Sequence, residues 1–487
     1  MRRPADTVVV DPSSSSRRRW RALCSLAALC LSGTLAQAAE TALDFDFAQA
    51  HDFLGFGTQV WLKGEKGDKG GDRGAKGGGN EEAGWQLLKE LNARFVRVSL
   101  IPKITFDQLR PGMSVEQYLE ILQRNDNPAQ RQRLSLFNQR LRELNIQPVL
   151  IFWRMPEPWV DKRQQKAGSK QQAHFARPDR LGDYANLVTA QMAWLQRQGV
   201  QAAAVELTNE PQGAWDTKYE REDYAALVQK TRTAMDANGL QRWPIAGPGT
   251  GIPNFDHYIG GILNSSAAKS LGYVSAHVYL KPDVLADRGT PGMASFLGRG
   301  KFGPILITEF GVKQHNDDDP AAESDLDVTA PDYGLQAAST AAMLLAQGAG
   351  GLIYWQLQDF SWNRKQHGML SESGERRPVA AAMKALFGSV PAGAKAVGAK
   401  APRAELPAVA LQAGGKSYLM LVNRSAQAQT VTAKLGGGAQ ACGALVRVDA
   451  YNTSGADARS AVRNASVQSC TVKAELQPGT VATVVMQ

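Results

Sequence analysis

The amino-acid sequence predicts an α/β protein in which a (β/α)8 TIM barrel is followed by a small C-terminal β-sandwich. Short apolar runs alternate with longer helical patterns from residue 53 to residue 388, as in a parallel sheet whose strands are joined by helices. After residue 403 the segments become short and alternating, with Gly, Asn and Ser between them, which is typical of an all-β domain. We therefore assign residues 41–388 to the barrel, 389–403 to a linker and 404–487 to the sandwich.

The first 38 residues have the three parts of a secretory leader. RRRWR (17–21) is basic, ALCSLAALCLSGTLA (22–36) is apolar, and AQA (36–38) supplies small residues for cleavage. The apolar run is shorter than a membrane span requires. The leader's six Arg and two Asp contribute +4 to the net charge of +9, so the rest of the chain carries +5. We expect residues 1–38 to be a signal peptide and the mature protein to be secreted or periplasmic.

Eight apolar runs are the candidates for the barrel strands. Each is rich in β-branched, aromatic or small apolar residues and ends in Gly or in polar residues. Eight such strands alternating with helices close most economically into a barrel. The runs are FLGFGTQVW (53–61), RFVRVSL (94–100), QPVLIFW (147–153), AAAVELTN (202–209), WPIAG (243–247), YVSAHVY (273–279), PILITEF (304–310) and GLIYWQL (351–357).

Three of the segments between these runs have a clear helical pattern. In residues 180–199 apolar side chains recur at helical spacing, for example at Leu181 and Val188. Residues 223–239 and 332–348 have the same design. Each of the three segments ends on Gly, which is common just after a helix. The sequence therefore predicts helices in all three places.

The C-terminal segment holds both cysteines that remain after the leader, Cys442 and Cys470. In an exported protein an even pair is a disulfide candidate, and a bridge would stabilise a small β domain. Two buried thiols are the alternative. The strands expected in this domain are 406–412, 417–425, 430–435, 444–452, 471–476 and 480–486.

Two of the barrel runs place a glutamate at their carboxyl ends. VELTNEP (205–211) brings Glu210 out of an apolar strand, and ILITEFG (305–311) presents Glu309 in the same way. In a barrel the carboxyl ends of all eight strands meet at one rim, where active sites lie. The two residues are 99 positions apart, and three βα units of about 31 residues would span roughly 93. We therefore expect both carboxylates to face one cleft.

Two carboxylates that face each other across a cleft are what glycoside hydrolysis requires. One stays protonated and donates to the leaving oxygen, while the other stays ionised and attacks the sugar or activates water. Either glutamate alone would more simply be a helix cap or an ion-pair partner. The presence of both at strand ends, at barrel spacing, favours a catalytic pair.

Four short motifs strengthen this interpretation: N-E-P at 209–211, H-x-Y at 277–279, T-E-F-G at 308–311 and Trp355. With them, residues 45–388 resemble the clan A glycoside hydrolases, most closely family five, the cellulase family, or a family thirty-nine type. The resemblance implies that Glu210 is the acid/base, that Glu309 is the nucleophile and that the anomeric configuration is retained. Family five usually has a His pair near the end of strand three, where this chain reads FWRMPEPW. The resemblance is therefore to the clan more than to that family.

The resemblance also implies roles for four residues around the pair. Asn209 would hold the sugar 2-hydroxyl, and Arg97 would lie beside the nucleophile and favour its ionised form. His277 and Tyr279 alternate by two, so they share one face of their strand. Tyr279 would donate to the nucleophile, and His277 would line the cleft near the acid. The plainer alternatives are a turn for Asn209, a surface ion pair for Arg97 and a core position for His277.

Tryptophans near the strand ends indicate a carbohydrate ligand. Trp355 matches the clan's platform under the sugar next to the cleaved bond, and an indole face can stack on the apolar C–H face of a sugar. Trp153 and Trp215 also follow strand ends and are expected to extend the platform. Trp159 and Trp362 are further candidates, although any single Trp is as readily a core residue.

The sequence thus predicts a secreted retaining β-glycoside hydrolase that acts on a β-linked polysaccharide or oligosaccharide, with endo action expected. The alternatives are a non-catalytic carbohydrate-binding barrel, which would need neither glutamate, and a transglycosylase of the same fold. The sequence has no clustered metal-ligand spacing, no phosphate-binding Gly loop and no basic stripe with interleaved aromatics. We therefore expect no metal, no organic cofactor and no nucleic-acid partner. We expect a monomer without membrane attachment once the leader is removed.

Overall fold

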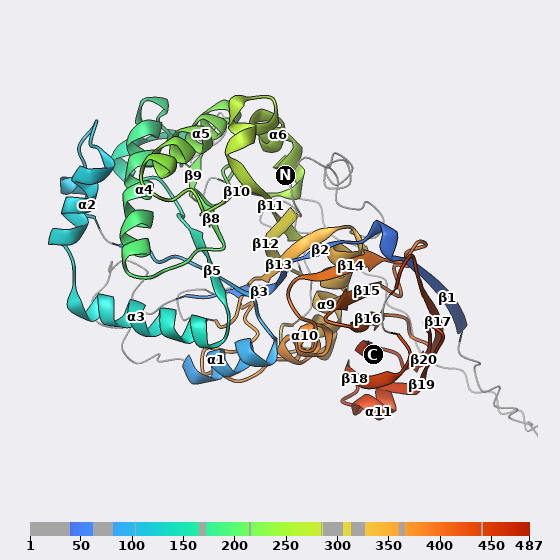
Figure 1. Ribbon diagram of the computed structural model, residues 1–487. Helices are drawn as coiled ribbons and strands as arrows, with labels where there is room; N and C mark the ends of the chain where they lie inside the picture. Colours follow the sequence, from blue (N-terminus) through green and yellow to red (C-terminus); the bar gives the residue numbers. More distant parts are fainter. Residues whose placement is uncertain are drawn as a thin grey trace, which may run out of the picture. The chain divides into compact units, whose positions relative to one another are not determined.

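The structure is a computed structural model (Figure 1). It describes residues 39–61, 81–102, 104–164, 172–213, 216–283, 285, 305–312, 327–359, 366–439 and 442–487. The predicted signal peptide therefore lies outside the described residues. Within the described ranges, none of the helices has the length and apolar character needed to cross a membrane.

Eight parallel strands form a closed barrel in the order β10-β11-β12-β13-β3-β4-β5-β8. The barrel closes where β13 pairs with β3, with Gly351 opposite Gly55. All eight apolar runs supply a strand, so the predicted fold class is confirmed. The strands are β3 (Gly55–Gln59), β4 (Phe95–Val98), β5 (Gln147–Ile151), β8 (Ala204–Glu206), β10 (Ile245–Gly251), β11 (Leu271–Tyr279), β12 (Ile305–Gly311) and β13 (Ala349–Tyr354).

Helices surround the barrel, and their ends follow local sequence signals. Ser114 caps the second helix by accepting from Gln117 N, and Asn127 caps the third directly before a Pro, both favoured arrangements. As predicted, a glycine follows the end of three helices. Gly199, Gly239 and Gly348 have φ of 83°, 76° and 96°, the left-handed conformation common just after a helix. The helices are α1 (Glu81–Glu90), α2 (Val115–Arg124), α3 (Pro128–Glu143), α4 (Leu181–Arg197), α5 (Arg221–Ala237), α6 (Ile252–Leu263), α9 (Pro331–Ala346), α10 (Pro378–Phe387) and the short α11 (Ala458–Ala461).

The lower half of the barrel interior is filled with apolar side chains. These are Phe95, Val149, Ala204, Ala246, Leu306 and Ile353. They come from six different strands and form one cluster, as in the layered interior of other (β/α)8 barrels.

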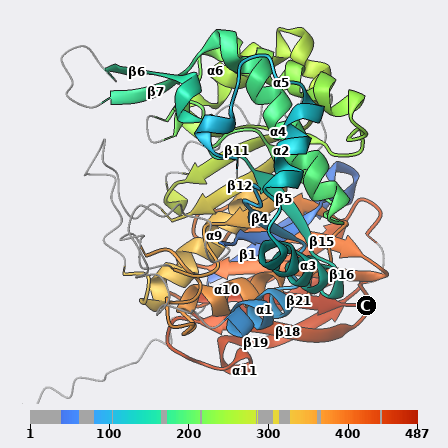
Figure 2. The same ribbon diagram turned by 90° about the vertical axis from the view of Figure 1, so that its left-hand side faces the viewer.

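A small sheet stands beside the carboxyl rim (Figure 2). It has the order β6-β7-β9, with bounds β6 (Val160–Gln164), β7 (Gln172–Ala176) and β9 (Thr217–Lys218). Met155 N donates to Thr217 Oγ1 (3.0 Å), which ties the chain after β5 to the first residue of β9. Thr217, seven residues after the predicted acid, is thereby held beside the end of β5.

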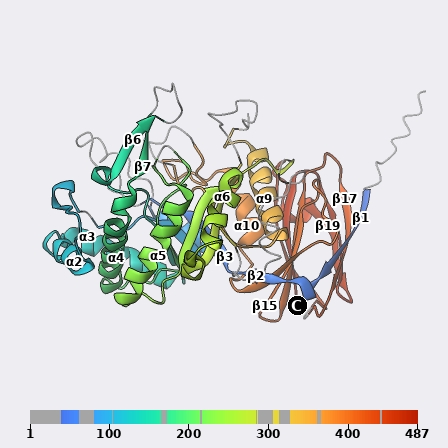
Figure 3. The ribbon, with the colours of Figure 1, turned by 90° about the horizontal axis from the view of Figure 1, so that it is seen from above.

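The C-terminal domain is a two-sheet β-sandwich that also uses the N-terminal segment of the described chain. β1 pairs in parallel with β17, and Figure 3 shows both at the edge of this domain. One sheet has the order β1-β17-β20-β19 and the other β18-β21-β16-β15-β14-β2. The bounds are β1 (Ala39–Asp46), β2 (His51–Phe53), β14 (Ala394–Gly398), β15 (Ala408–Ala413), β16 (Lys416–Asn423), β17 (Gln429–Gly436), β18 (Leu445–Asn452), β19 (Val462–Gln468), β20 (Thr471–Leu476) and β21 (Thr480–Met486).

The sandwich includes a segment that the sequence-based domain assignment placed outside it. Residues 389–403, expected to be a linker, contain β14, which pairs with both β15 and β2. The small residues of AKAVG resembled a linker, but they suit a buried strand packed close to its neighbours. The sandwich also packs on the barrel helices, since Thr483 Oγ1 donates to Leu386 O (2.9 Å) and Tyr451 OH to Pro331 O (2.8 Å).

Cys442 and Cys470 form a disulfide across the sandwich, with their Cα atoms 4.9 Å apart. The bridge joins residues 28 positions apart and restricts the unfolded chain accordingly. The double substitution Cys442→Ser/Cys470→Ser is expected to lower the stability of the sandwich by about 3 kcal/mol. Urea unfolding of both proteins measures this difference. Equal unfolding midpoints, with and without reductant, would contradict the bridge.

Candidate active site

The candidate residues lie in or directly after several strands of the barrel, at its carboxyl rim, and two of these strands, β11 and β12, are neighbours. His277 in β11 stands opposite Glu309 in β12 in the register of that strand pair, so the sheet itself places the two side chains together. Glu210 follows β8 in a turn with φ of 41°, a left-handed conformation that is uncommon for residues with a side chain. Its N–H donates to Gly249 O (3.2 Å). The turn therefore holds the acid in a strained position of the kind found at functional sites.

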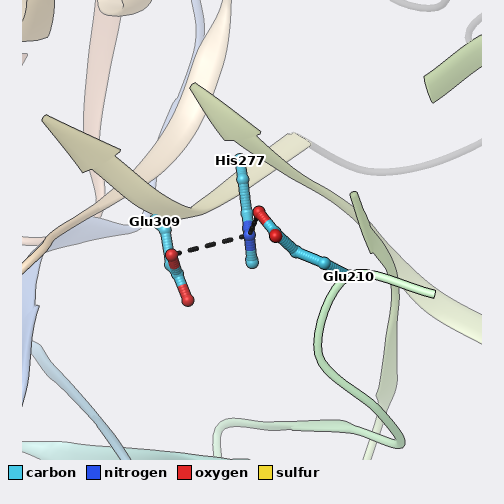
Figure 4. Close-up of side chains that lie close together, drawn as sticks. All are labelled: Glu210, His277 and Glu309. Carbon is cyan, nitrogen blue, oxygen red and sulfur yellow. Dashed lines mark hydrogen bonds and ion pairs between the residues drawn. The ribbon is translucent and has the colours of Figure 1, made fainter. Parts of the chain in front are cut away.

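The two glutamates meet across His277 (Figure 4). His277 Nδ1 lies 2.8 Å from Glu210 Oε1 and 3.6 Å from Glu309 Oε2. One oxygen of each carboxylate and one ring nitrogen of the histidine all lie within 4.8 Å of one another. Retaining glycosidases hold their carboxyl groups about 5–5.5 Å apart, whereas inverting enzymes need about 6.5–9.5 Å. The spacing here is nearer to the first of these ranges.

Arg97 in β4 is fully buried and forms hydrogen bonds both to Glu309 and to residues in and after β8. Its Nε donates to Glu206 Oε2 (2.7 Å), and its Nη1 donates to Glu309 Oε1 (2.6 Å) and Gln59 Oε1 (3.1 Å). Its Nη2 donates to Asn209 Oδ1 (3.0 Å). Burial alone would lower the pKa of Arg97, but the charges of Glu206 and Glu309 raise it above its ordinary value. Arg97 is therefore a permanent cation beside Glu309.

Glu206 in β8 is a third carboxylate, which the sequence analysis did not select. It is buried, and its Oε1 accepts from Ser275 Oγ (2.8 Å) and Thr308 Oγ1 (2.7 Å). Burial would raise the pKa of Glu206, but Arg97 and His277 hold it below the ordinary value. The available signal was its place in VELTNEP, where it is a charged residue inside an apolar strand, four residues before the predicted acid. Its role is to balance the charge of the buried guanidinium.

Tyr279 and His277 contact the two acids as the resemblance implied. Tyr279 OH donates to Glu309 Oε2 (2.5 Å). Burial and the charge of Glu309 raise the pKa of Tyr279 well above its ordinary value, so the hydroxyl remains a donor at neutral pH. Burial would lower the pKa of His277, but Glu309 and Glu210 together raise it. His277 is thereby in hydrogen-bond contact with Glu210 and in ion-pair range of Glu309.

Three tryptophans gather beside these residues, and one of them was not selected from the sequence. Trp61 stacks on Trp153 with ring centroids 5.0 Å apart, and Trp355 meets both rings edge-on at 5.8 and 6.1 Å. Trp61 ends the first apolar run, where it resembled one more strand residue. The Arg97 guanidinium lies 5.1 Å from the Trp153 ring centroid. The cluster therefore adjoins the carboxylates and offers half-buried aromatic surface.

The other tryptophan candidates do not join this cluster in the described structure. Trp159 is 2% exposed and belongs to the hydrophobic core. It was a candidate for the cleft because it follows a strand end, but its side chain is buried in the core instead of facing solvent. Trp215 and Trp362 lie outside the described residues, so their predicted roles stay predictions.

Glu210, His277 and Glu309 are also, among the residues that the structure describes, the one group of His, Cys, Asp or Glu side chains spaced to hold a metal ion. The Arg97 guanidinium already lies 2.6 Å from Glu309, and it would repel a second cation at this distance. Nδ1 of His277 is engaged with Glu210. The arrangement therefore fits acid–base and nucleophilic chemistry better than metal binding.

Solved structures share this fold, although no family model and no curated protein matches the chain. A glycoside hydrolase family 30 endoxylanase from Clostridium papyrosolvens is 16% identical, and the alignment covers 92% of this chain and 100% of that one at a TM-score of 0.66. A family 30 subfamily 8 xylanase from Clostridium acetobutylicum is 16% identical over 91% and 98%, at 0.65. An endo-β-1,6-glucanase is 13% identical over 91% and 94%, at 0.61.

These similarities establish the fold and support the resemblance to clan A. Two of the three structures are family 30 proteins, and none of the three is described as family five or thirty-nine. The motifs that suggested those two families lie at the barrel rim, which the clan shares. The likeness is therefore one of fold, consistent with the resemblance to the clan, and the family within the clan stays a prediction.

Gly249 in β10 has no room for a side chain. Its φ is 59°, and an added Cβ would lie 2.7 Å from Glu206 Oε1 and 3.7 Å from His277 Nε2. We expect Gly249→Ala to lower the free energy of unfolding by about 2 kcal/mol, because it strains the backbone and pushes on a buried ion pair. Urea unfolding measures the loss. Gly260→Ala is the matched control, since nothing lies within 4 Å of its added Cβ and Ala favours helix; equal stability of the two variants would contradict this account.

Proposed function

We propose that this protein is a retaining β-glycoside hydrolase in which Glu309 is the nucleophile and Glu210 is the acid/base. The observation that carries the proposal is the approach of the two carboxylates. Their oxygens lie within 4.8 Å of each other and of His277, at the rim where barrel enzymes react. That spacing suits direct attack on a sugar and leaves no room for the water molecule that an inverting enzyme activates.

The environments of the two glutamates support this division of roles. Glu309 accepts from a permanent cation, Arg97, and from Tyr279, and its side chain is 7% exposed. These contacts orient the Glu309 carboxylate and place a positive charge beside it. Glu210 is the more exposed of the two, at 14%, and its contact with His277 provides a proton within hydrogen-bond reach. Glu210 is thereby suited to exchange protons with a leaving group and with water.

The first step forms a covalent intermediate. A Glu309 oxygen attacks the anomeric carbon, the bond from that carbon to the leaving oxygen breaks, and Glu210 gives its proton to the leaving oxygen. In the second step Glu210 takes a proton from water, the water oxygen attacks the anomeric carbon, and the ester bond to Glu309 breaks. Two inversions give net retention, and both glutamates return to their starting states.

The surroundings of the pair support a saccharide substrate with more than one sugar. Trp61, Trp153 and Trp355 form a connected aromatic surface beside the carboxylates, and such surfaces stack on sugar rings. The similar structures include an endoxylanase and an endo-β-1,6-glucanase. We therefore propose a β-linked polysaccharide as substrate, endo cleavage, and export of the enzyme by residues 1–38.

Variants of the two glutamates test the assignment on an activated aryl β-glycoside chosen from a panel of sugars. Glu309→Gln is expected to reduce kcat by about 10⁴-fold or more, because no covalent intermediate forms. Glu210→Ala is expected to slow substrates with poor leaving groups far more than activated ones, because good leaving groups need no proton.

The control for these variants is Glu372→Gln, which changes an exposed glutamate and is expected to keep wild-type kcat. Thermal unfolding of all three variants checks that they fold. Full activity of Glu309→Gln or of Glu210→Ala on poor leaving groups would refute the assignment. Rapid loss of polysaccharide viscosity, with few reducing ends formed, would support endo cleavage.

A further inference from the structure

Asp216 lies at the edge of the site, and none of the steps above uses it. Its Oδ2 accepts from Asn209 Nδ2 (3.1 Å). On the other side of the same amide, Asn209 Oδ1 accepts from Arg97 Nη2 (3.0 Å). Arg97 can only donate, and an ionised aspartate can only accept. The two partners together therefore fix which way the Asn209 amide faces.

We propose that Asp216 is a positioning residue that holds the Asn209 amide in the orientation needed for contact with the sugar. One N–H of Asn209 is engaged by Asp216, and the second N–H of the same nitrogen is left for a sugar hydroxyl. The terminal torsion of an Asn side chain has a broad energy profile, so the amide turns easily once a partner is lost. The inference rests on the proposed function, because it assigns Asp216 to the same substrate contact.

The backbone around Asp216 is built to keep its carboxylate in place. Thr217, the next residue, begins β9 and pairs with His174 of β7. Thr217 Oγ1 also accepts from Met155 N (3.0 Å), just after β5. Asp216 is therefore attached directly to an ordered element on which two other segments converge, as a residue that supports a reactive group should be.

The charge of Asp216 depends on pH in the range where glycosidases work. The titratable and charged groups that face it are Arg154, Tyr184, Glu210, Tyr219 and Glu309. Burial, chiefly, raises the pKa of Asp216 to about 6; Asn209 and Arg154 oppose this, and the two glutamates add to it. As pH falls through about 6, Asp216 gains a proton and becomes a weaker acceptor for Asn209. The amide is therefore held most firmly above that pH.

A double-mutant cycle distinguishes positioning from general support of the fold. Asp216→Ala and Asn209→Ala are each expected to lower kcat/KM by about tenfold, and the double variant should be no slower than Asn209→Ala alone, because Asp216 acts through Asn209. Losses that multiply in the double variant would overturn the proposal. Thermal unfolding of each variant checks that a lost rate is not lost structure.

Asp216→Asn provides a second and independent test, because its amide oxygen still accepts from Asn209 but cannot titrate. It is expected to restore much of the rate lost in Asp216→Ala and to remove the ionisation near pH 6 from the kcat/KM profile. An unchanged ionisation would overturn the proposal.

A crystal structure of Asp216→Ala completes the test without depending on turnover. The Asn209 amide is expected to have turned away from its bond with Arg97, and an amide in its original place would overturn the inference. If the wild-type protein hydrolysed no glycoside, the proposed function would fail, while the amide position would still decide the role of Asp216.

Discussion

The site depends on one buried cation. The Arg97 guanidinium is removed from water and bonds to groups from β3, β8 and β12 as well as to the residue before the acid. A buried charge is costly unless it is fully paired, and removing one partner commonly costs about 3–5 kcal/mol. Glu206 supplies the pairing that Glu309 would otherwise supply alone. Because Glu206 also pairs with Arg97, Glu309 takes only one of the guanidinium's hydrogen bonds, and its second oxygen accepts from Tyr279.

The barrel backbone determines where the carboxylates and the histidine around Arg97 lie. Strand register sets His277 beside Glu309, a left-handed turn after β8 brings Glu210 to the same histidine, and Gly249 leaves space for the Glu206 carboxylate. The aromatic surface of Trp61, Trp153 and Trp355 adjoins these groups. Rigid strands thus hold these groups next to an apolar layer of the barrel interior.

The sequence was informative where structure follows from local pattern. The eight apolar runs predicted the barrel strands, and glutamates at the ends of two of them predicted the carboxylate pair Glu210 and Glu309. Both predictions were possible because hydrophobic periodicity and strand-ending residues are local properties of the sequence. The pairing of strands far apart in the sequence could not be predicted. Thr41 of β1 donates a hydrogen bond to Gln429 of β17, 388 positions away, and neither segment has a sequence pattern that indicates the other as its partner. Glu206 and Trp61 were hidden for another reason, since each continues a strand pattern and its function appears only when neighbouring strands are in place.

The most direct test of this account is the stereochemistry of hydrolysis, followed by proton NMR of the anomeric signals as a β-linked oligosaccharide is cleaved. Carboxylate oxygens within 4.8 Å of each other predict that the β-anomer of the product appears first and that the α-anomer follows only by slow mutarotation. First appearance of the α-anomer would show inversion and would contradict the assignment of Glu309 as the attacking group.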